Sequence, residues 1–225
     1  MQQLFQLLSA LFYPHYCPGC GAEVQGEGLL CEICRQEVWN PRSMHPESLD
    51  APFLDGVYVL YNYEGGIQKA LQLVKFQKRE DLLPRLAKTW AEGIQEASLF
   101  QWDIPEGVKM ALVTIPTDTT RKKERGYDIP EEIFCPWGKT TGLVWDPLLV
   151  RTRSTLPQFN LDKTQRRENV KNCFALRRNE NLPEIVFLAD DIFTTGATLA
   201  EAARVLKKAG IRYVYGLALA SGMDV

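Results

Sequence analysis

The sequence of 225 residues has no apolar run long enough to span a bilayer and no internal repeat or low-complexity tract. Its first eight residues lack the basic start and the small-residue cleavage site of a secretory signal peptide. We therefore expect a cytoplasmic protein with no membrane span, in which residues 1–8 form a short amphipathic helix. The formal net charge is only −2. The chain as a whole is therefore not attracted to nucleic acid or membranes, and any polyanion site must be a local patch.

Histidine is also scarce, and two CxxC motifs near the N-terminus instead predict a zinc site. The motifs are Cys17 with Cys20 and Cys31 with Cys34. Each motif places two sulfurs on one side of a tight turn, and four thiolates complete a tetrahedral structural site with no open position. A pair of disulfides is the alternative, but a chain without a secretory signal belongs in a reducing compartment, which favours zinc. His15 could replace a thiolate, although the four cysteines already complete the shell.

The remaining composition predicts one sizeable α/β domain beside this small N-terminal unit. The chain is 45% apolar, and prolines and acids over residues 41–52 are typical of a linker. We therefore assign residues 1–50 to an N-terminal helix, zinc ribbon and linker, and residues 51–225 to the main domain. Apolar periodicity predicts strands over 57–63, 110–116, 185–189 and 211–220, a turn at 65–66, and helices over 67–76, 82–94 and from 197 onward.

Residues 185–199 carry the strongest functional pattern, an apolar strand followed by two acids, a hydroxyl-rich glycine turn and a helix start. Ligands of open α/β sheets bind at the carboxyl ends of the strands, and a helix N-terminus there favours an anion. Asp190 and Asp191 can accept hydrogen bonds from vicinal ribose hydroxyls, but adjacent strand residues face opposite ways, so one acid alone is expected to touch the sugar directly. The predicted phosphate loop comprises Thr194, Thr195, Gly196, Ala197 and Thr198. A solvated polar turn with an ordinary helix cap is the structural alternative.

Two basic segments are the second part of the predicted site. The loop after the strand at 110–116 combines hydroxyls with cations, which suits a pyrophosphate clamp, since cations offset oxyanion charge. A second basic run over residues 151–171 suggests a mobile loop that closes over a substrate. Their alternatives are a solvated basic turn and, for residues 163–171, an exposed helix face. The candidate pyrophosphate and loop residues are Thr117, Arg121, Lys122, Arg125, Arg151 and Arg153.

The string from residue 186 to 198 is similar to the signature of type I phosphoribosyltransferases. That resemblance implies a type I phosphoribosyltransferase fold, with an open, mostly parallel sheet flanked by helices. It also implies binding of phosphoribosyl pyrophosphate, usually with magnesium.

Further motifs extend the resemblance to nearly the whole chain, which is identified as similar to the ComF/GntX family of phosphoribosyltransferase-like proteins with an N-terminal zinc ribbon. The matching segments are the paired CxxC motifs, 63–65, 73–76, 115–116, 121–127, 151–158 and 166–170, together with the acid loop. Two positions depart from the family. Asp128 and Ile129 replace the usual Asn-Gln pair, and Ala189 replaces the usual valine before the acids.

The resemblance implies a phosphoribosyl pyrophosphate-binding protein linked to DNA uptake in competence or to the use of external DNA. In this reading Asp190 and Asp191 are the candidate catalytic residues. Two alternatives stay open. One is an active phosphoribosyltransferase, a glycosyltransferase of nucleoside metabolism that works in nucleotide salvage. The other is a non-catalytic scaffold that binds single-stranded DNA or docks a competence helicase or uptake protein. A steep fall of DNA affinity with salt would favour the DNA reading.

Overall fold

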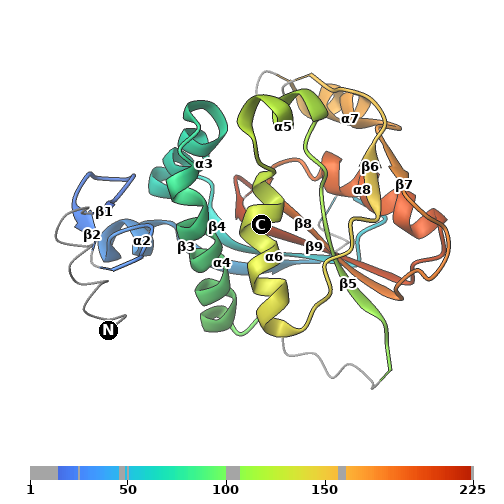
Figure 1. The fold of residues 1–225 in the computed structure, drawn as a ribbon, viewed down its shortest axis with the longest axis horizontal. Helices are drawn as coiled ribbons and strands as arrows, with labels where there is room; N and C mark the ends of the chain where they lie inside the picture. The colour runs from blue at the N-terminus through green and yellow to red at the C-terminus, as the bar shows by residue number, and fades with distance from the viewer. Residues whose placement is uncertain are drawn as a thin grey trace.

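The computed structural model describes residues 15–24, 26–45, 49, 51–99, 107–156 and 161–223. Within these residues a five-stranded sheet forms the centre of the molecule, with the strand order β3-β4-β9-β8-β5 (Figure 1). Strands β4, β9, β8 and β5 run parallel, and β3 pairs antiparallel with β4 at one edge. The strands are β3 Trp39–Met44, β4 Gly56–Asn62, β5 Met110–Thr114, β8 Ile185–Phe193 and β9 Tyr213–Ser221. The predicted α/β class with an open, mostly parallel sheet is therefore confirmed.

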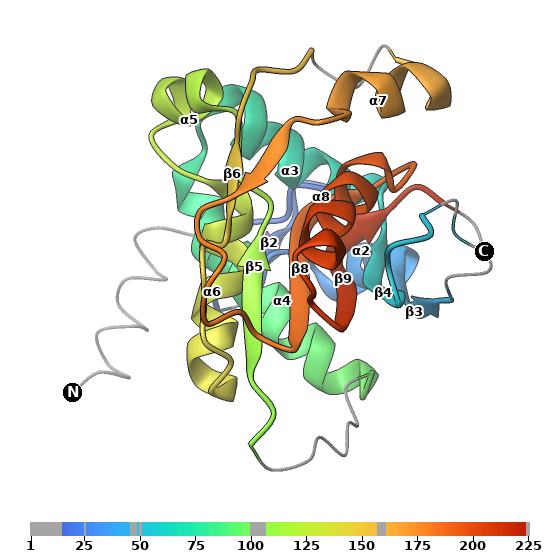
Figure 2. The same cartoon turned by 90° about the vertical axis from the view of Figure 1, so that its right-hand side faces the viewer.

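Alternating side chains of the strands build a hydrophobic core on each face of the sheet. On β8, Phe187 and Ala189 join the core under helices α3, α4 and α6, whereas Val186 and Leu188 join the core under helix α8 and the two-stranded sheet β6–β7. Figure 2 shows α8 on the opposite side of the sheet from α6. These elements are α3 Gly65–Gln77, α4 Leu83–Ala97, α6 Ile129–Thr141, α8 Ala197–Lys208, β6 Leu149–Arg151 and β7 Phe174–Leu176.

The N-terminal ribbon packs against α3 and α4. It consists of β1 His15–Tyr16, β2 Glu23–Val24 and α2 Glu32–Val38. The guanidinium of Arg85 on α4, 6% exposed, donates to the carbonyl oxygens of Gly28 and Leu29. On α3, Lys69 Nζ donates to Gly19 O at 2.7 Å. Because a buried carbonyl that loses its donor is costly, these contacts fasten the ribbon to the two helices.

Several predicted boundaries are wrong, each for a local reason. Residues 41–44 were expected to begin a linker but belong to β3, where Pro41 is tolerated because the strand lies at a sheet edge. The glycine pair at 65–66 begins α3 instead of forming a separate turn. The cationic loop after β5 is helix α5, Thr119–Arg125, because Asp118 caps it by accepting from the backbone N–H of Thr120 at 3.1 Å.

Other expectations were met or lie outside the described residues. The strands and helices predicted over 57–63, 67–76, 82–94, 110–116, 185–189, 197 onward and 211–220 are present with small shifts. The run 163–171 contains helix α7, Lys163–Val170, so the helical alternative is the correct one there. The predicted helix at 1–8 and the segment 157–160 are not described. Among the described helices, none is both long and apolar enough to cross a bilayer.

Candidate functional site

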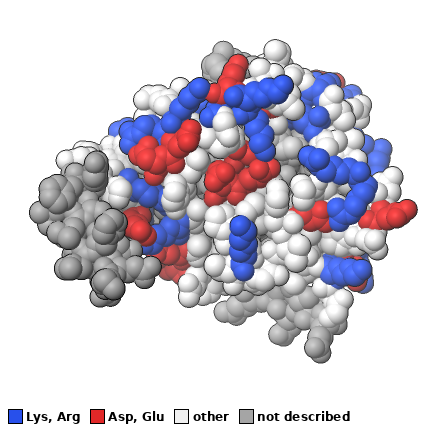
Figure 3. Space-filling view, in the orientation of Figure 1, with Lys and Arg blue, Asp and Glu red and all other residues white. Residues whose placement is uncertain are grey.

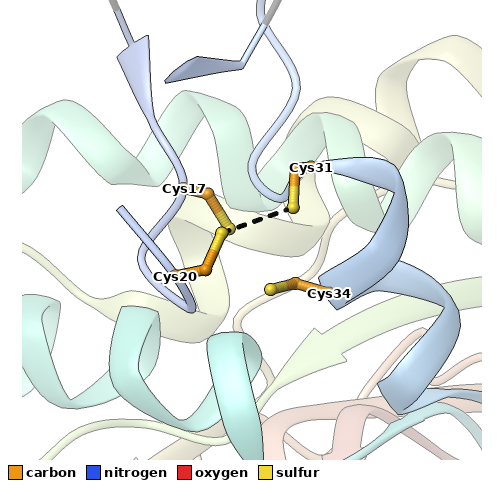
Figure 4. Close-up of side chains that lie close together, drawn as sticks. All are labelled: Cys17, Cys20, Cys31 and Cys34. Carbon is orange, nitrogen blue, oxygen red and sulfur yellow. Dashed lines mark hydrogen bonds between the residues drawn. The ribbon is translucent and has the colours of Figure 1, made fainter. Parts of the chain in front are cut away.

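The four cysteines of the CxxC motifs converge in the ribbon (Figure 4). Their sulfur atoms all lie within 4.8 Å of one another, and the Sγ atoms of Cys20 and Cys31 are 3.6 Å apart. A tetrahedral zinc ion with Zn–S bonds of about 2.3 Å would hold its sulfurs about 3.8 Å apart, so the cluster fits this metal. The six cysteines form no disulfide in this structure, and the convergence of four sulfurs supports the zinc interpretation over a pair of disulfides.

The loop of the first motif needs a glycine at position 19. A Cβ there would lie 2.8 Å from Cys34 Sγ. Burial acts to raise the pKa of the Cys17 thiol, but backbone N–H groups of Cys31, Cys20 and Gly19 outweigh it and lower this pKa to about 7. The turn thus favours the thiolate, the form that zinc binds, at Cys17, whereas burial and the neighbouring thiols raise the pKa of Cys34.

The two acids of the predicted sugar site lie where β8 extends beyond its neighbour β5. Thr114 at the end of β5 pairs with Ala189, so Asp190 and Asp191 project past the β5 strand end. Asp191 lies on the α3 side of the sheet, where it pairs with Lys75. The simple alternation of β8 does not extend past Ala189, since Ile192 packs against the α3 core and Phe193 against the α8 core. The carboxyl edge of the sheet therefore presents both acids beyond the end of β5.

Lys75 of α3 completes this acidic pair. Its Nζ lies 2.6 Å from Asp191 Oδ2, with the two side chains 21% and 10% exposed. Asp190 Oδ1 accepts the backbone N–H of Asp191 at 2.9 Å. Burial, followed by the neighbouring Asp191 carboxylate, raises the pKa of Asp190 well above its ordinary value. Sequence reasoning assigned Lys75 no role, although it lies in the matched segment 73–76, directly after the buried residue Val74.

The predicted phosphate loop follows directly after the acids. Gly196 adopts φ +75°, and α8 begins behind it with no side-chain cap on its first turn. Thr195 Oγ1 is buried and has no hydrogen-bond partner among the described residues. The N–H groups of the first helical turn, with the positive end of the helix dipole, therefore form an arrangement suited to an anion.

Four of the predicted pyrophosphate residues contact neighbouring loops or helix α3. Arg121 Nη2 donates to Thr155 O at 3.0 Å, and Arg151 Nη1 donates to Thr155 Oγ1 at 2.9 Å. Arg125 Nε donates to Lys75 O at 3.0 Å, which places α5 beside the acidic pair. The Thr117 backbone N–H donates to Asp128 Oδ2 at 3.1 Å. The structure thus joins α5, the loop after β6 and the end of α3.

The other two predicted cations point elsewhere. Lys122 Nζ lies 3.1 Å from a Glu131 carboxylate oxygen on α6. Arg153 Nη2 donates to the carbonyl oxygens of Asn169 and Lys171 at the end of α7. Figure 3 shows lysine and arginine side chains gathered over the α5 end of the molecule. These two residues therefore contribute to a cationic surface and have no described contact with the acid loop.

Asp128, which stands where the ComF/GntX family usually has asparagine, is 2% exposed. Its Oδ2 accepts from Thr117 and lies 3.7 Å from Lys122 Nζ, while its Oδ1 is buried without a hydrogen-bond partner among the described residues. Burial, the largest cause, raises the pKa of this carboxyl above 3.8, and the Glu131 charge adds to the rise.

We expect Asp128→Asn to stabilise the protein at neutral pH. Because the folded state raises the pKa of Asp128, it binds this proton more tightly than the unfolded chain does. The contribution of Asp128 to stability is thus present below pH 3.8 and is lost as pH rises through the raised pKa. Urea unfolding of both proteins at pH 4 and pH 8 should show a larger gain for the variant at pH 8. Equal gains at both pH values would contradict the prediction.

Comparisons with known proteins agree with these features. The family model "Double zinc ribbon domain" matches residues 8–45. The chain is 29% identical to competence protein F of Haemophilus influenzae over 213 residues, which cover 91% of this chain and 85% of that protein. It is 25% identical to DNA utilization protein YhgH of Salmonella typhimurium over 86% of this chain and 78% of that protein. It is also 25% identical to competence protein ComFC of Bacillus subtilis, over 87% of this chain and 73% of that protein.

These similarities confirm the resemblance to the ComF/GntX family. The ribbon model and the converging thiols together support a structural zinc site.

Proposed function

We propose that this ComF/GntX-type protein binds phosphoribosyl pyrophosphate, as its magnesium complex, at the carboxyl edge of the sheet. We further propose a role linked to DNA uptake or DNA use. The relatives named as competence and DNA utilization proteins support that role. The division into residues 1–50 and 51–225 stays part of this proposal, with the second part as the ligand-binding unit.

The observation that carries the proposal is the order of groups along β8 and α8. The uncapped first turn of α8, with Gly196 before it, would hold the 5′-phosphate through backbone N–H groups. Asp190 and Asp191 lie one loop away, where carboxylate oxygens can accept from the ribose hydroxyls. A ligand that fills both the phosphate site and the diol site must carry a phosphate and a sugar. The arrangement therefore favours a sugar phosphate as the ligand over an inorganic anion or a free nucleoside.

The cationic segments give this site its third part. Arg125 is fastened beside Lys75, and Arg121 and Arg151 meet at Thr155. We propose that these guanidinium groups face the pyrophosphate, where charge-assisted hydrogen bonds would offset its oxyanions. Magnesium bound to the pyrophosphate would supply further charge neutralisation. If the protein transfers the phosphoribosyl group, as in nucleotide salvage, its residues would act by positioning and electrostatic stabilisation.

Calorimetric titration of magnesium and phosphoribosyl pyrophosphate into the purified protein tests the proposal. We expect saturable binding by the wild-type protein, and no measurable binding after Asp190→Asn combined with Asp191→Asn, because neither position then offers a carboxylate to the diol. Asp81→Asn, an exposed carboxylate paired with Arg79, is the control and should bind like wild type. Undiminished affinity in the double variant would contradict the site, and folded wild-type protein that does not bind would contradict the function.

The cationic surface favours one second candidate, binding of single-stranded DNA. Helix α5 carries Lys122, Lys123 and Arg125 in its last turn, and none of its residues is buried. Contacts of such residues with phosphates would make the affinity for an oligonucleotide fall steeply with salt. Absence of binding even at low salt would exclude this candidate.

A further inference from the structure

Two carboxylates on adjacent residues need a compensating cation when they are largely removed from water. Asp190 and Asp191 are consecutive, and Asp191 is 7% exposed. Among the ion pairs of the described residues, the pair with Lys75 is the one that links these acids to another element. Tyr63, which follows β4, lies close enough to feel both charges. Burial is the main cause of its raised pKa, the Lys75 charge lowers this pKa, and the Asp191 charge raises it. A buried charge without a partner would be strongly disfavoured here.

The end of α3 that carries Lys75 is itself held from the other side of the site. Arg125 Nε donates to Lys75 O at 3.0 Å, and the Tyr127 hydroxyl donates to Val74 O at 2.7 Å. The Tyr127 bond is buried. The backbone of α3 thus contacts the end of the cationic helix, while the Lys75 side chain contacts the acid loop. One residue therefore connects the predicted pyrophosphate side of the site to the predicted ribose side.

We propose that Lys75 is a positioning residue that holds Asp191 in place and leaves Asp190 as the acid that contacts the ligand. This inference rests on the proposed function. Oδ2 of Asp191 is buried and lies 2.6 Å from Lys75 Nζ, so this oxygen is not available to the sugar. Asp190 Oδ1 accepts the Asp191 N–H, so fixing Asp191 also fixes the direction of the Asp190 carboxylate. Lys75 acts through the two acids and need not touch the sugar.

The test compares the magnesium and phosphoribosyl pyrophosphate affinity of wild-type protein with that of three variants. We expect Lys75→Met to weaken binding about tenfold or more, because it leaves a largely buried carboxylate without its cation. Lys75→Arg keeps the positive charge and should restore most of the affinity. Asp191→Asn should retain measurable binding, since Asp190 still contacts the ligand. Lys139→Met, at an exposed lysine of α6, is the control for loss of one positive charge and should bind like wild type.

A combined variant separates positioning from general structural support. In an Asp191→Asn background, Lys75→Met should cost little further affinity, because Lys75 then has no carboxylate to hold. A role in folding alone would instead lower the unfolding midpoint of Lys75→Met with unchanged affinity of the folded protein.

Four results would overturn the proposal. They are wild-type affinity in Lys75→Met, failure of Lys75→Arg to restore binding, complete loss of binding in Asp191→Asn, and an equal cost of Lys75→Met with and without Asp191. Each leaves wild-type binding intact and so counts against the role of Lys75 alone. Absence of binding by the wild-type protein would overturn the proposed function and this inference together.

Discussion

Cys17→Ser should abolish stoichiometric zinc binding and unfold the ribbon. A serine hydroxyl is a poor replacement for a thiolate at a closed four-sulfur site, and Cys17 is 2% exposed, so the change also leaves a buried polar group. Structural zinc contributes about 10–16 kcal/mol of apparent binding free energy in zinc-finger peptides at neutral pH. Because the ribbon packs on α3 and α4, we expect the free energy of unfolding of the whole chain to fall by at least about 4 kcal/mol, which lowers the melting midpoint by ~10 °C.

Cys135→Ser is the matched control for this experiment. Cys135 lies on α6 and is not part of the four-sulfur cluster. It should keep one zinc per chain by metal analysis and a melting midpoint near that of wild type. Zinc content in Cys17→Ser equal to that of the control, measured on reduced protein, would refute the assignment of the metal site.

Gly196→Val should cost both stability and ligand affinity. At φ +75° a β-branched residue is strained, and a Cβ would lie 2.9 Å from Cζ of Phe193, whose ring is 1% exposed. Relief of that contact requires the loop to move away from β8. Since the loop leads into the uncapped first turn of α8, we expect about 2 kcal/mol of destabilisation and at least tenfold weaker binding of phosphoribosyl pyrophosphate.

Gly142→Val separates the backbone cost from the cost at the site. Gly142 has φ +73° at the end of α6, and nothing lies within 4 Å of its Cβ position. This variant should lose stability through the backbone conformation but bind the ligand like wild type. If Gly196→Val bound as tightly as Gly142→Val, the loop before α8 would not be the phosphate site.

Most of the sheet could be predicted from the sequence because its strands are apolar and separated by clear turn residues. The run 185–189 is an example, since it reads as a buried strand whichever helix covers it. The end of this strand could not be predicted in the same way. Asp190 and Asp191 look like loop residues, yet β8 continues to Phe193 because β9 pairs with it as far as Ser221. Pairing with a distant strand overrode the local preference of the two acids.

The site was predictable in its chemistry more than in its contacts. The thiols of the ribbon and the acid-threonine-glycine loop are patterns whose spacing carries their role. The ion pair between Lys75 and Asp191 joins residues more than a hundred positions apart, and a lysine at the end of an amphipathic helix normally faces solvent. Likewise, the sequence around Thr117 gave no sign that Asp128 would be buried against it.

Strand β3 has a consequence for how the chain can be divided. It comes from the N-terminal part of the sequence, yet Arg42, Ser43 and Met44 pair with Val59, Tyr58 and Val57 of β4. A fragment that began at residue 51 would leave one side of β4 without hydrogen-bond partners, as a free edge on which a second molecule could add a strand. The N-terminal part therefore replaces the regular edge of β4 with an edge strand that is interrupted by Pro41 and by a register shift between Trp39 and Arg42, features that oppose intermolecular strand addition.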